Sequence, residues 1–263
     1  MALAAMVPGA APNAAAADGP PQPLQVLDLA PDLDVPAARF TNWMRARGWK
    51  TVLGSAEHFF VRDGRLHLVS RPGPVHRDRF RLAIFDRERL LEGLETKVLL
   101  QLTGEDFRAD PARHPVIAFA MQPLELPDES ADLRDSSRND AAFYLLVSFD
   151  TERRDYHGYD LPLTVAYVWA NRPWDQPVGR DPDYQAFLRY IPVGAGRPPP
   201  AAPVTVRRHL AADFRAAYPE EGAAPDIIRI ALMIDSNTLG GEAETAVSRI
   251  RLAPAGQGSK AQN

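Results

Sequence analysis

One strand near the middle of the chain constrains the fold most. Residues 141–149 place large apolar side chains on both faces. One face carries Phe143, Leu145, Val147 and Phe149, and the other carries Tyr144, Leu146 and Ser148. Successive side chains of a strand point to opposite faces, so both faces of this strand have to be covered. The pattern predicts a central strand in a sheet that packs against other structure.

Short runs of β-forming residues recur along the chain and outnumber the helix signals. They cover 58–70, 95–103, 115–124, 163–171, 187–193, 203–210, 226–235 and 244–252. Helical patterns are confined to 36–49, 86–94 and 211–221. Proline occupies 25 of 263 positions, which favours many short elements joined by turns. These features predict an all-β protein with a few short helices, an antiparallel β-sandwich of jelly-roll or concanavalin-like type.

The strand pattern is bounded by two segments of different composition. Residues 1–22 are rich in Ala and Pro and resemble the cleavage region of an export signal, without its basic and full apolar regions. Residues 254–263 have the composition of a disordered tail. We therefore expect a leader or signal remnant at 1–22, one sandwich domain at 23–253 and a tail at 254–263. A periplasmic or secreted location follows from this interpretation.

Charge and composition exclude several classes of protein. The net charge is −4, whereas a nucleic-acid-binding protein or a polybasic membrane anchor needs a basic face. Cysteine is absent, so disulfides and thiolate-bound metals are excluded. The sequence contains no apolar run of 18 residues, and we expect no membrane-spanning helix. The oligomeric state is left open by these observations.

Polar side chains follow the apolar strand at 226–235 and raise the question of a site. Asp235, Asn237 and Thr238 precede a Gly-Gly pair, which suits a simple turn. Asp140 precedes the strand at 141–149, and antiparallel pairing of the two strands would bring Asp140 and Asp235 together. Asp140, Asp235 and Asn237 would then supply oxygen ligands for a structural Ca²⁺. A buried hydrogen-bond network and a catalytic pair of Asp140 and Asp235 are the remaining alternatives.

Two loops carry aromatic residues that suit ligand binding. Tyr156, His157 and Tyr159 lie among charges in residues 150–160, and Trp174 lies in a proline-rich stretch. Such side chains stack on sugar rings, although a solvated hairpin tip also explains the first group. The six histidines show no helical pair or His-x-His spacing that would indicate a histidine metal centre. Nucleotide-binding glycine motifs and the serine-hydrolase elbow are absent from the sequence.

Three segments together resemble a known family. They are RNDAAFYLLVSFD at 138–150, TVAYVWAN at 164–171, and the stretch at 207–252 that contains IALMIDSNTLGG. In this order they are similar to the bacterial domain-of-unknown-function 3047 family, over residues 40–252. The resemblance implies an exported bacterial protein with a jelly-roll-like sandwich and no established activity. Asn139 and Ser236 replace acids that are usual in the family's motifs, which weakens the case for a fully charged metal site.

The sequence supports three functions to different degrees. We expect an extracytoplasmic sandwich that binds a carbohydrate or envelope glycan through Tyr156, His157, Tyr159 and Trp174. One alternative is a glycan-active hydrolase or lyase that uses Asp140 and Asp235 as a carboxylate pair. The other is a structural envelope protein without a small ligand. The sequence does not decide whether the protein is an enzyme.

Overall fold

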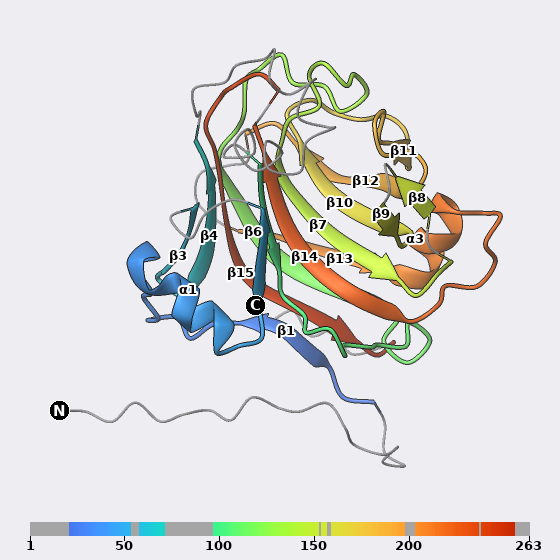
Figure 1. The fold of residues 1–263 in the computed structure, drawn as a ribbon, viewed down its shortest axis with the longest axis horizontal. Coiled ribbons are helices and arrows are strands. Elements are labelled where there is room, and N and C mark those ends of the chain that lie inside the picture. The colour runs from blue at the N-terminus through green and yellow to red at the C-terminus, as the bar shows by residue number, and fades with distance from the viewer. Residues whose placement is uncertain are drawn as a thin grey trace.

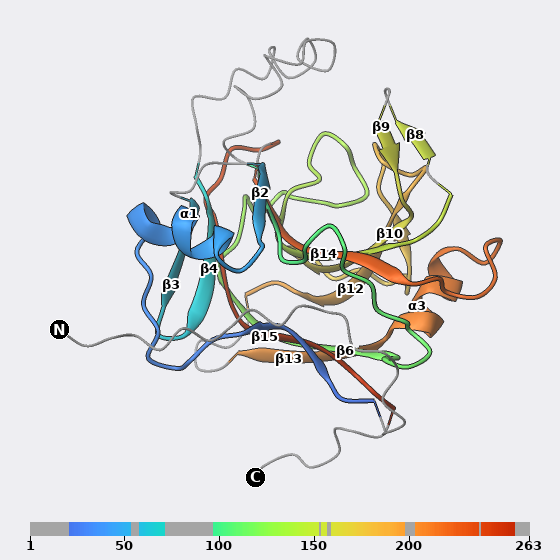
Figure 2. The same ribbon diagram turned by 60° about the horizontal axis from the view of Figure 1, so that its bottom comes forward.

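The protein is a sandwich of two β-sheets (Figures 1 and 2). The computed structural model describes residues 21–53, 58–71, 97–152, 154–156, 159–197, 203–236 and 238–255. The six-stranded sheet consists of β1 (Leu24–Asp28), β3 (Phe59–Arg62), β4 (Arg65–Ser70), β6 (Val116–Glu125), β13 (Val204–His209) and β15 (Ala243–Ala253). The seven-stranded sheet consists of β2 (Lys50–Leu53), β5 (Lys97–Gln101), β7 (Ala141–Phe149), β10 (Thr164–Ala170), β11 (Gly179–Arg180), β12 (Leu188–Ala195) and β14 (Ile227–Asp235). The expected fold class is confirmed.

Smaller elements flank the two sheets. The strands β8 (Arg154–Tyr156) and β9 (Tyr159–Leu161) form a separate hairpin, which projects from the seven-stranded sheet on the side away from the six-stranded one (Figure 2). Two helices, α1 (Ala37–Arg45) and α3 (Leu210–Ala217), correspond to two of the three helical patterns in the sequence. The third pattern, at 86–94, lies outside the described residues.

The main core lies between the sheets and is closed by aromatic contacts. Phe119 on β6 packs against Phe143 on β7 and Tyr167 on β10, with ring centroids 5.8 Å and 6.0 Å apart. All three side chains are buried. Contacts of this kind add to the hydrophobic stabilisation that comes from removing the ring surfaces from water. They also join the apolar faces of the two sheets, which the alternation of apolar and polar residues predicts to be buried.

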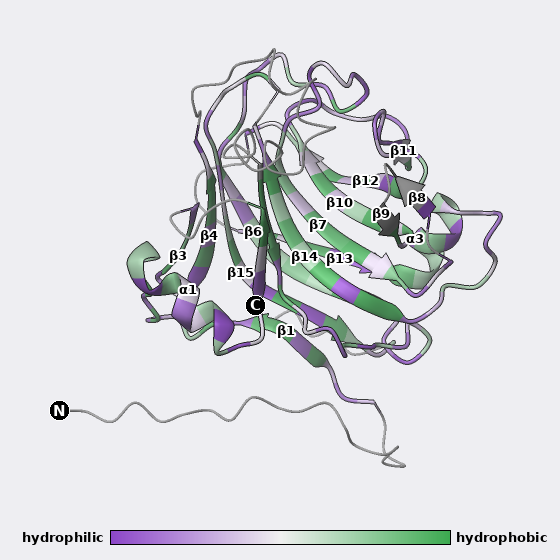
Figure 3. Ribbon diagram, viewed as in Figure 1, coloured by the Kyte–Doolittle hydropathy of each residue, from purple (hydrophilic) through white to green (hydrophobic). Residues whose placement is uncertain are grey.

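The strand β7 is central, as its two apolar faces predict. It pairs with β10 on one side and β14 on the other, both antiparallel. Figure 3 shows it hydrophobic along most of its length. Its inner face meets the second sheet, whereas its outer face meets a smaller cluster beneath the loops, in which Tyr144 and Tyr190 are buried. The seven-stranded sheet is therefore covered on both sides at this point.

Local turn chemistry also follows the sequence. Asp63 and Gly64 join β3 to β4 with φ angles of 49° and 63°, the positive values that a two-residue hairpin turn requires. A Cβ atom on Gly64 would lie 2.3 Å from the carbonyl oxygen of Ala30, so the neighbouring chain also selects glycine here. The predicted hairpin is confirmed.

One strand pair departs from the antiparallel rule. β10 and β12 run parallel, whereas the other pairs in the two sheets are antiparallel. The connection between them spans 171–187 and contains β11, so the chain has room to return to the end at which β10 began. This long connection covers part of the outer face of the sheet and contributes to the candidate site. In the described part of the chain, no helix is long and apolar enough to span a membrane.

Candidate functional site

Asp140 and Asp235 lie at the same end of the seven-stranded sheet. Asp140 directly precedes β7, Asp235 ends β14, and Asp235 is paired with Ala141 in the antiparallel register. Each residue is 1% exposed. The start of one strand thus meets the end of its neighbour, as the sequence argument expects, and two acidic residues are buried near each other.

The carboxylate of Asp140 holds the turn that follows β14. Its Oδ1 accepts a hydrogen bond from the backbone N–H of Thr238 at 2.9 Å, and its Oδ2 accepts one from the N–H of Leu239 at 2.8 Å. The hydroxyl of Thr238 donates to Oδ1 of Asn139 at 3.0 Å. These bonds satisfy backbone donors that the turn would otherwise leave unpaired. The sequence left open whether this cluster is a simple turn or a buried hydrogen-bond network. The contacts show a turn that is held by such hydrogen bonds.

Burial and like charge raise the pKa of Asp140. Removal from water is the larger cause and the nearby carboxylate of Asp235 is the next, and together they raise the pKa to about 6 despite the two backbone hydrogen bonds. Burial also raises the pKa of the Tyr144 hydroxyl, with Asp235, Asp181 and Asp140 as further causes. Tyr144 therefore lies close to a layer of three buried acids, Asp140, Asp181 and Asp235.

Asp181 is the third acid of this layer, and the sequence analysis did not identify it. Its Oδ1 accepts backbone hydrogen bonds from Asp183 and Tyr184 at 2.8 Å and 2.6 Å, and its Oδ2 accepts one from the hydroxyl of Tyr190. It is 1% exposed. The Asp-Pro pair at 181–182 is a turn signal that would have pointed to it. The carboxylates of Asp140 and Asp181 thus each hold the backbone of a separate loop at this sheet.

The raised pKa of Asp140 predicts that stability depends on pH. A carboxyl with a higher pKa in the folded state binds its proton more tightly there, so its contribution is complete below pH 3.8 and is lost as the pH rises through about 6. The contribution to the free energy of unfolding should fall by up to about 3 kcal/mol across this range. Asp235→Asn removes one cause of the shift and should move the fall to lower pH. Urea unfolding at several pH values measures the free energy of unfolding of the wild-type protein and of Asp235→Asn. Identical pH profiles for the two proteins would contradict the prediction.

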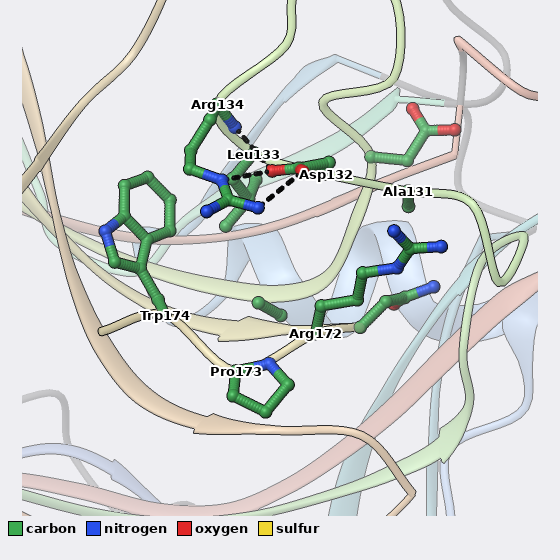
Figure 4. A pocket seen from close by; sticks show the side chains of 10 residues that line it. Ala131, Asp132, Leu133, Arg134, Arg172, Pro173 and Trp174 are labelled. Atoms are coloured by element: carbon green, nitrogen blue, oxygen red, sulfur yellow. Dashed lines mark hydrogen bonds and ion pairs between the residues drawn. The ribbon is translucent and has the colours of Figure 1, made fainter. Parts of the chain in front are cut away.

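A small pocket lies beside Asp140 at the loop end of the sheet (Figure 4). Its lining comes from residues 131–134, Asp140 and residues 170–174. The space open to the centre of a water molecule is about 10 Å³, which is room for about one water. A sugar ring does not fit inside it, so any larger ligand at this end has to lie on the rim.

Charged and aromatic side chains form that rim. Arg134 donates to both carboxylate oxygens of Asp132, at 2.8 Å and 2.7 Å, and this pairing lowers the pKa of Asp132 to about 2. Arg172 is exposed and donates from Nε to the backbone carbonyl of Glu129 at 3.3 Å. Figure 4 shows Trp174, Arg134 and Arg172 around the same opening, with Asp132 between them. The rim thus combines one aromatic ring with two guanidinium groups.

Trp174 is held in place although it remains partly exposed. Its ring meets the ring of Tyr190 edge-on, at 6.1 Å between centroids and 84° between planes. A Cβ atom on Gly179 would lie 2.0 Å from the indole, so the ring packs directly against the backbone of β11. Its Nε1 is buried and has no hydrogen-bond partner among the described residues. The indole is therefore a rigid surface at the loop end.

The structure describes the other predicted ligand-binding residues only in part. Tyr156 and Tyr159 are opposite each other at the end of the β8–β9 hairpin. His157 lies outside the described residues, as does Asn237 of the predicted metal site. Within the described ranges, no group of three or more acidic or histidine residues has the arrangement of a metal site. Binding of Ca²⁺ by Asp140, Asp235 and Asn237 remains a prediction.

A second depression, which was not expected from the sequence, lies on the outer face of the six-stranded sheet. It is an open hollow of about 500 Å³, lined by Arg62, Asp63, Arg65, His67, Gln122, Leu124 and Pro203. These residues come from β3, β4, β6 and the segment before β13, which are distant in sequence. Only the strand pairing brings them together.

Fold and site define the chain as a two-sheet β-sandwich with buried carboxylates beneath its loops. Residues 76–251, about two thirds of the chain, match the model of a family described as a protein of unknown function, DUF3047. The chain therefore belongs to this family, as its motifs suggested. No match to a curated protein was found.

Proposed function

We propose that the protein binds a carbohydrate of the bacterial envelope at the loop end of the seven-stranded sheet. The observation that carries the proposal is the fixed, partly exposed indole of Trp174 beside Arg134 and Arg172 (Figure 4). A ring that is already immobilised loses little conformational entropy when a ligand stacks on it. A flat aromatic surface with donors at its edge suits the apolar face and hydroxyl rim of a sugar.

The two guanidinium groups would have different roles at this rim. Arg134 is paired with Asp132, so together they offer both donors and acceptors to sugar hydroxyls. Arg172 has no ion pair with a described residue, so it adds a positive charge next to the indole. A glycan with an acidic group near the stacked ring would use this charge. The Tyr156, His157 and Tyr159 hairpin would extend the surface for longer glycans.

Two further parts of the proposal rest on the sequence. The small-residue leader at 1–22 supports an extracytoplasmic location, which cell fractionation tests. The oxygen-rich turn at 235–238 supports a structural Ca²⁺ with Asp140 and Asp235 as ligands. Such an ion would offset the repulsion between two buried acids. A chelator that leaves the melting temperature unchanged would remove the ion from the proposal.

The test of the binding site is the substitution of Trp174. Trp174→Ala should lower the affinity for a bound glycan by about tenfold or more, if stacking of a sugar ring on the indole matches the roughly 1–3 kcal/mol that stacking of a nucleic-acid base on an aromatic side chain contributes. Trp174→Phe should retain part of it. Titration calorimetry with a glycan that the wild-type protein binds measures the effect.

A matched control is Trp43→Ala. Trp43 is also partly buried, packs against Phe40 with 5.5 Å between ring centroids and carries Arg47 over its ring, but it lies on α1. This variant should bind the glycan as the wild-type protein does. Equal loss in both variants would show that stability, and not stacking on Trp174, explains the effect.

A catalytic role for Asp140 is the second candidate function. The observation in its favour is that Asp140 lines the small pocket and has a pKa raised to about 6, the range of a general acid in glycoside hydrolysis. Both of its oxygens accept backbone hydrogen bonds, so the turn at 238–239 would have to move during turnover. Release of reducing ends from the bound glycan, abolished in Asp140→Asn, is the result that this candidate requires.

A further inference from the structure

The depression on the six-stranded sheet has the side chains of a ligand site. Leu66 and Leu68 of β4 point into the core. Because side chains alternate along a strand, Arg65 and His67 point to the outer face of the sheet. With about 500 Å³, the hollow has the volume of a small-molecule site. It is far larger than the water-sized pocket near Trp174.

Two arginines of this hollow lack an acidic partner among the described residues. Arg62 is exposed and lies over the ring of Phe60, with 5.0 Å between its guanidinium carbon and the ring centroid. Arg65 donates from Nη1 to Oε1 of Gln122 at 3.0 Å and forms no ion pair in that part of the chain. Other arginines of the same sheet, such as Arg249 with Asp28, do have a carboxylate nearby. The lining of the hollow thus holds two guanidinium groups against one carboxylate, that of Asp63.

His67 is fixed so that one ring nitrogen remains for a ligand. Its ring stacks on Phe60 at 4.6 Å between centroids and 13° between planes. Its Nδ1 lies 2.7 Å from Oε1 of Glu244 on β15, and this carboxylate oxygen selects the tautomer with hydrogen on Nδ1. Nε2 has no partner among the described residues, and His67 lines the hollow. The imidazole thus offers an oriented acceptor beside the two guanidinium groups.

We propose that this hollow binds the carboxylate of an acidic sugar. Planar guanidinium groups form paired hydrogen bonds with a carboxylate, and this geometry favours Arg62 and Arg65 as its partners. His67 and Asp63 then bind neighbouring hydroxyls. The site is separate from the Trp174 rim and does not depend on the function proposed there.

The experiment measures binding of a trimer of galacturonic acid to the full chain by titration calorimetry. The wild-type protein should bind it, and Arg62→Ala and Arg65→Ala should each weaken binding about tenfold or more. The matched control is Arg207→Ala, an exposed arginine of the same sheet outside the hollow. This variant should bind as the wild-type protein does.

Four outcomes would overturn the proposal. The first is that the trimer does not bind, and the second is equal affinity for a neutral galactose trimer. The third is competition by inorganic phosphate at the concentration of the trimer, which would indicate a general anion site. The fourth is equal weakening in Arg207→Ala. Arg65→Lys, which keeps the charge and loses the planar fork, guards against misfolding: it should keep the wild-type melting temperature and still bind several-fold more weakly.

Discussion

Replacing Leu145 by alanine should lower the free energy of unfolding by about 2–5 kcal/mol. Leu145 is completely buried at the middle of β7, between Tyr167 on β10 and Leu232 on β14 in the strand register. Its removal leaves a cavity in a core that is closed on both sides, so neighbouring side chains cannot fill the space without strain. Urea unfolding followed by far-ultraviolet circular dichroism measures the loss.

The matched control is Val52→Ala. Val52 is a strand residue of the same sheet, but its side chain is 45% exposed. Its truncation should change the free energy of unfolding by less than about 0.5 kcal/mol. A loss below about 1 kcal/mol for Leu145→Ala would show that β7 lies at an edge and that the two-sheet architecture is wrong.

Asp140→Ala should cost about 2–4 kcal/mol at neutral pH. The substitution leaves the amides of Thr238 and Leu239 without their acceptor, and each unpaired donor costs about 1–3 kcal/mol when water cannot replace the lost partner. Removal of the carboxylate also relieves the cost of burying its charge and the repulsion with Asp235, the two causes that raise the pKa of Asp140, and this offsets part of the loss. The loss of both acceptors should outweigh this relief, because two backbone donors are left unpaired, whereas the raised pKa corresponds to a relief of no more than about 3 kcal/mol.

Asp106→Ala is the control for this substitution. Asp106 is an exposed aspartate with no hydrogen bond to a described residue through its side chain, and its removal should leave the stability unchanged. Differential scanning calorimetry compares the two variants. A melting temperature equal to that of the wild-type protein in Asp140→Ala would mean that the turn after β14 does not depend on this carboxylate.

Features set by residues close in sequence could be predicted. The alternation in 141–149 predicted a central strand, and Asp63-Gly64 predicted a hairpin, because each depends on neighbouring residues alone. The meeting of Asp140 and Asp235 required one further assumption, that β7 and β14 are antiparallel neighbours. The alternation of Arg249 and Arg251 with Ile250 and Leu252 likewise matches the open and buried faces of β15.

Features set by the pairing of distant strands could not be predicted. The parallel arrangement of β10 and β12 depends on how the long connection crosses the sheet, which no local pattern encodes. The hollow near His67 combines residues up to 141 positions apart, from Arg62 to Pro203. The Asp-Pro pair at 181–182 indicates a turn, but the burial of Asp181 depends on the fold, which places Tyr190 against it. Which polar side chains are buried, and against which partners, is therefore known only from the structure.

The most direct test of carbohydrate binding is a glycan array probed with the full chain, with and without a chelator. The proposal predicts that the wild-type protein binds a defined group of envelope glycans and that Trp174→Ala binds them about tenfold or more weakly. Loss of glycan binding in the presence of the chelator would add Ca²⁺ to the site. Glycan binding that persists with the chelator would assign recognition to the side chains alone. An array on which the folded wild-type protein binds no glycan in either condition would contradict the proposal and favour a structural protein of the envelope.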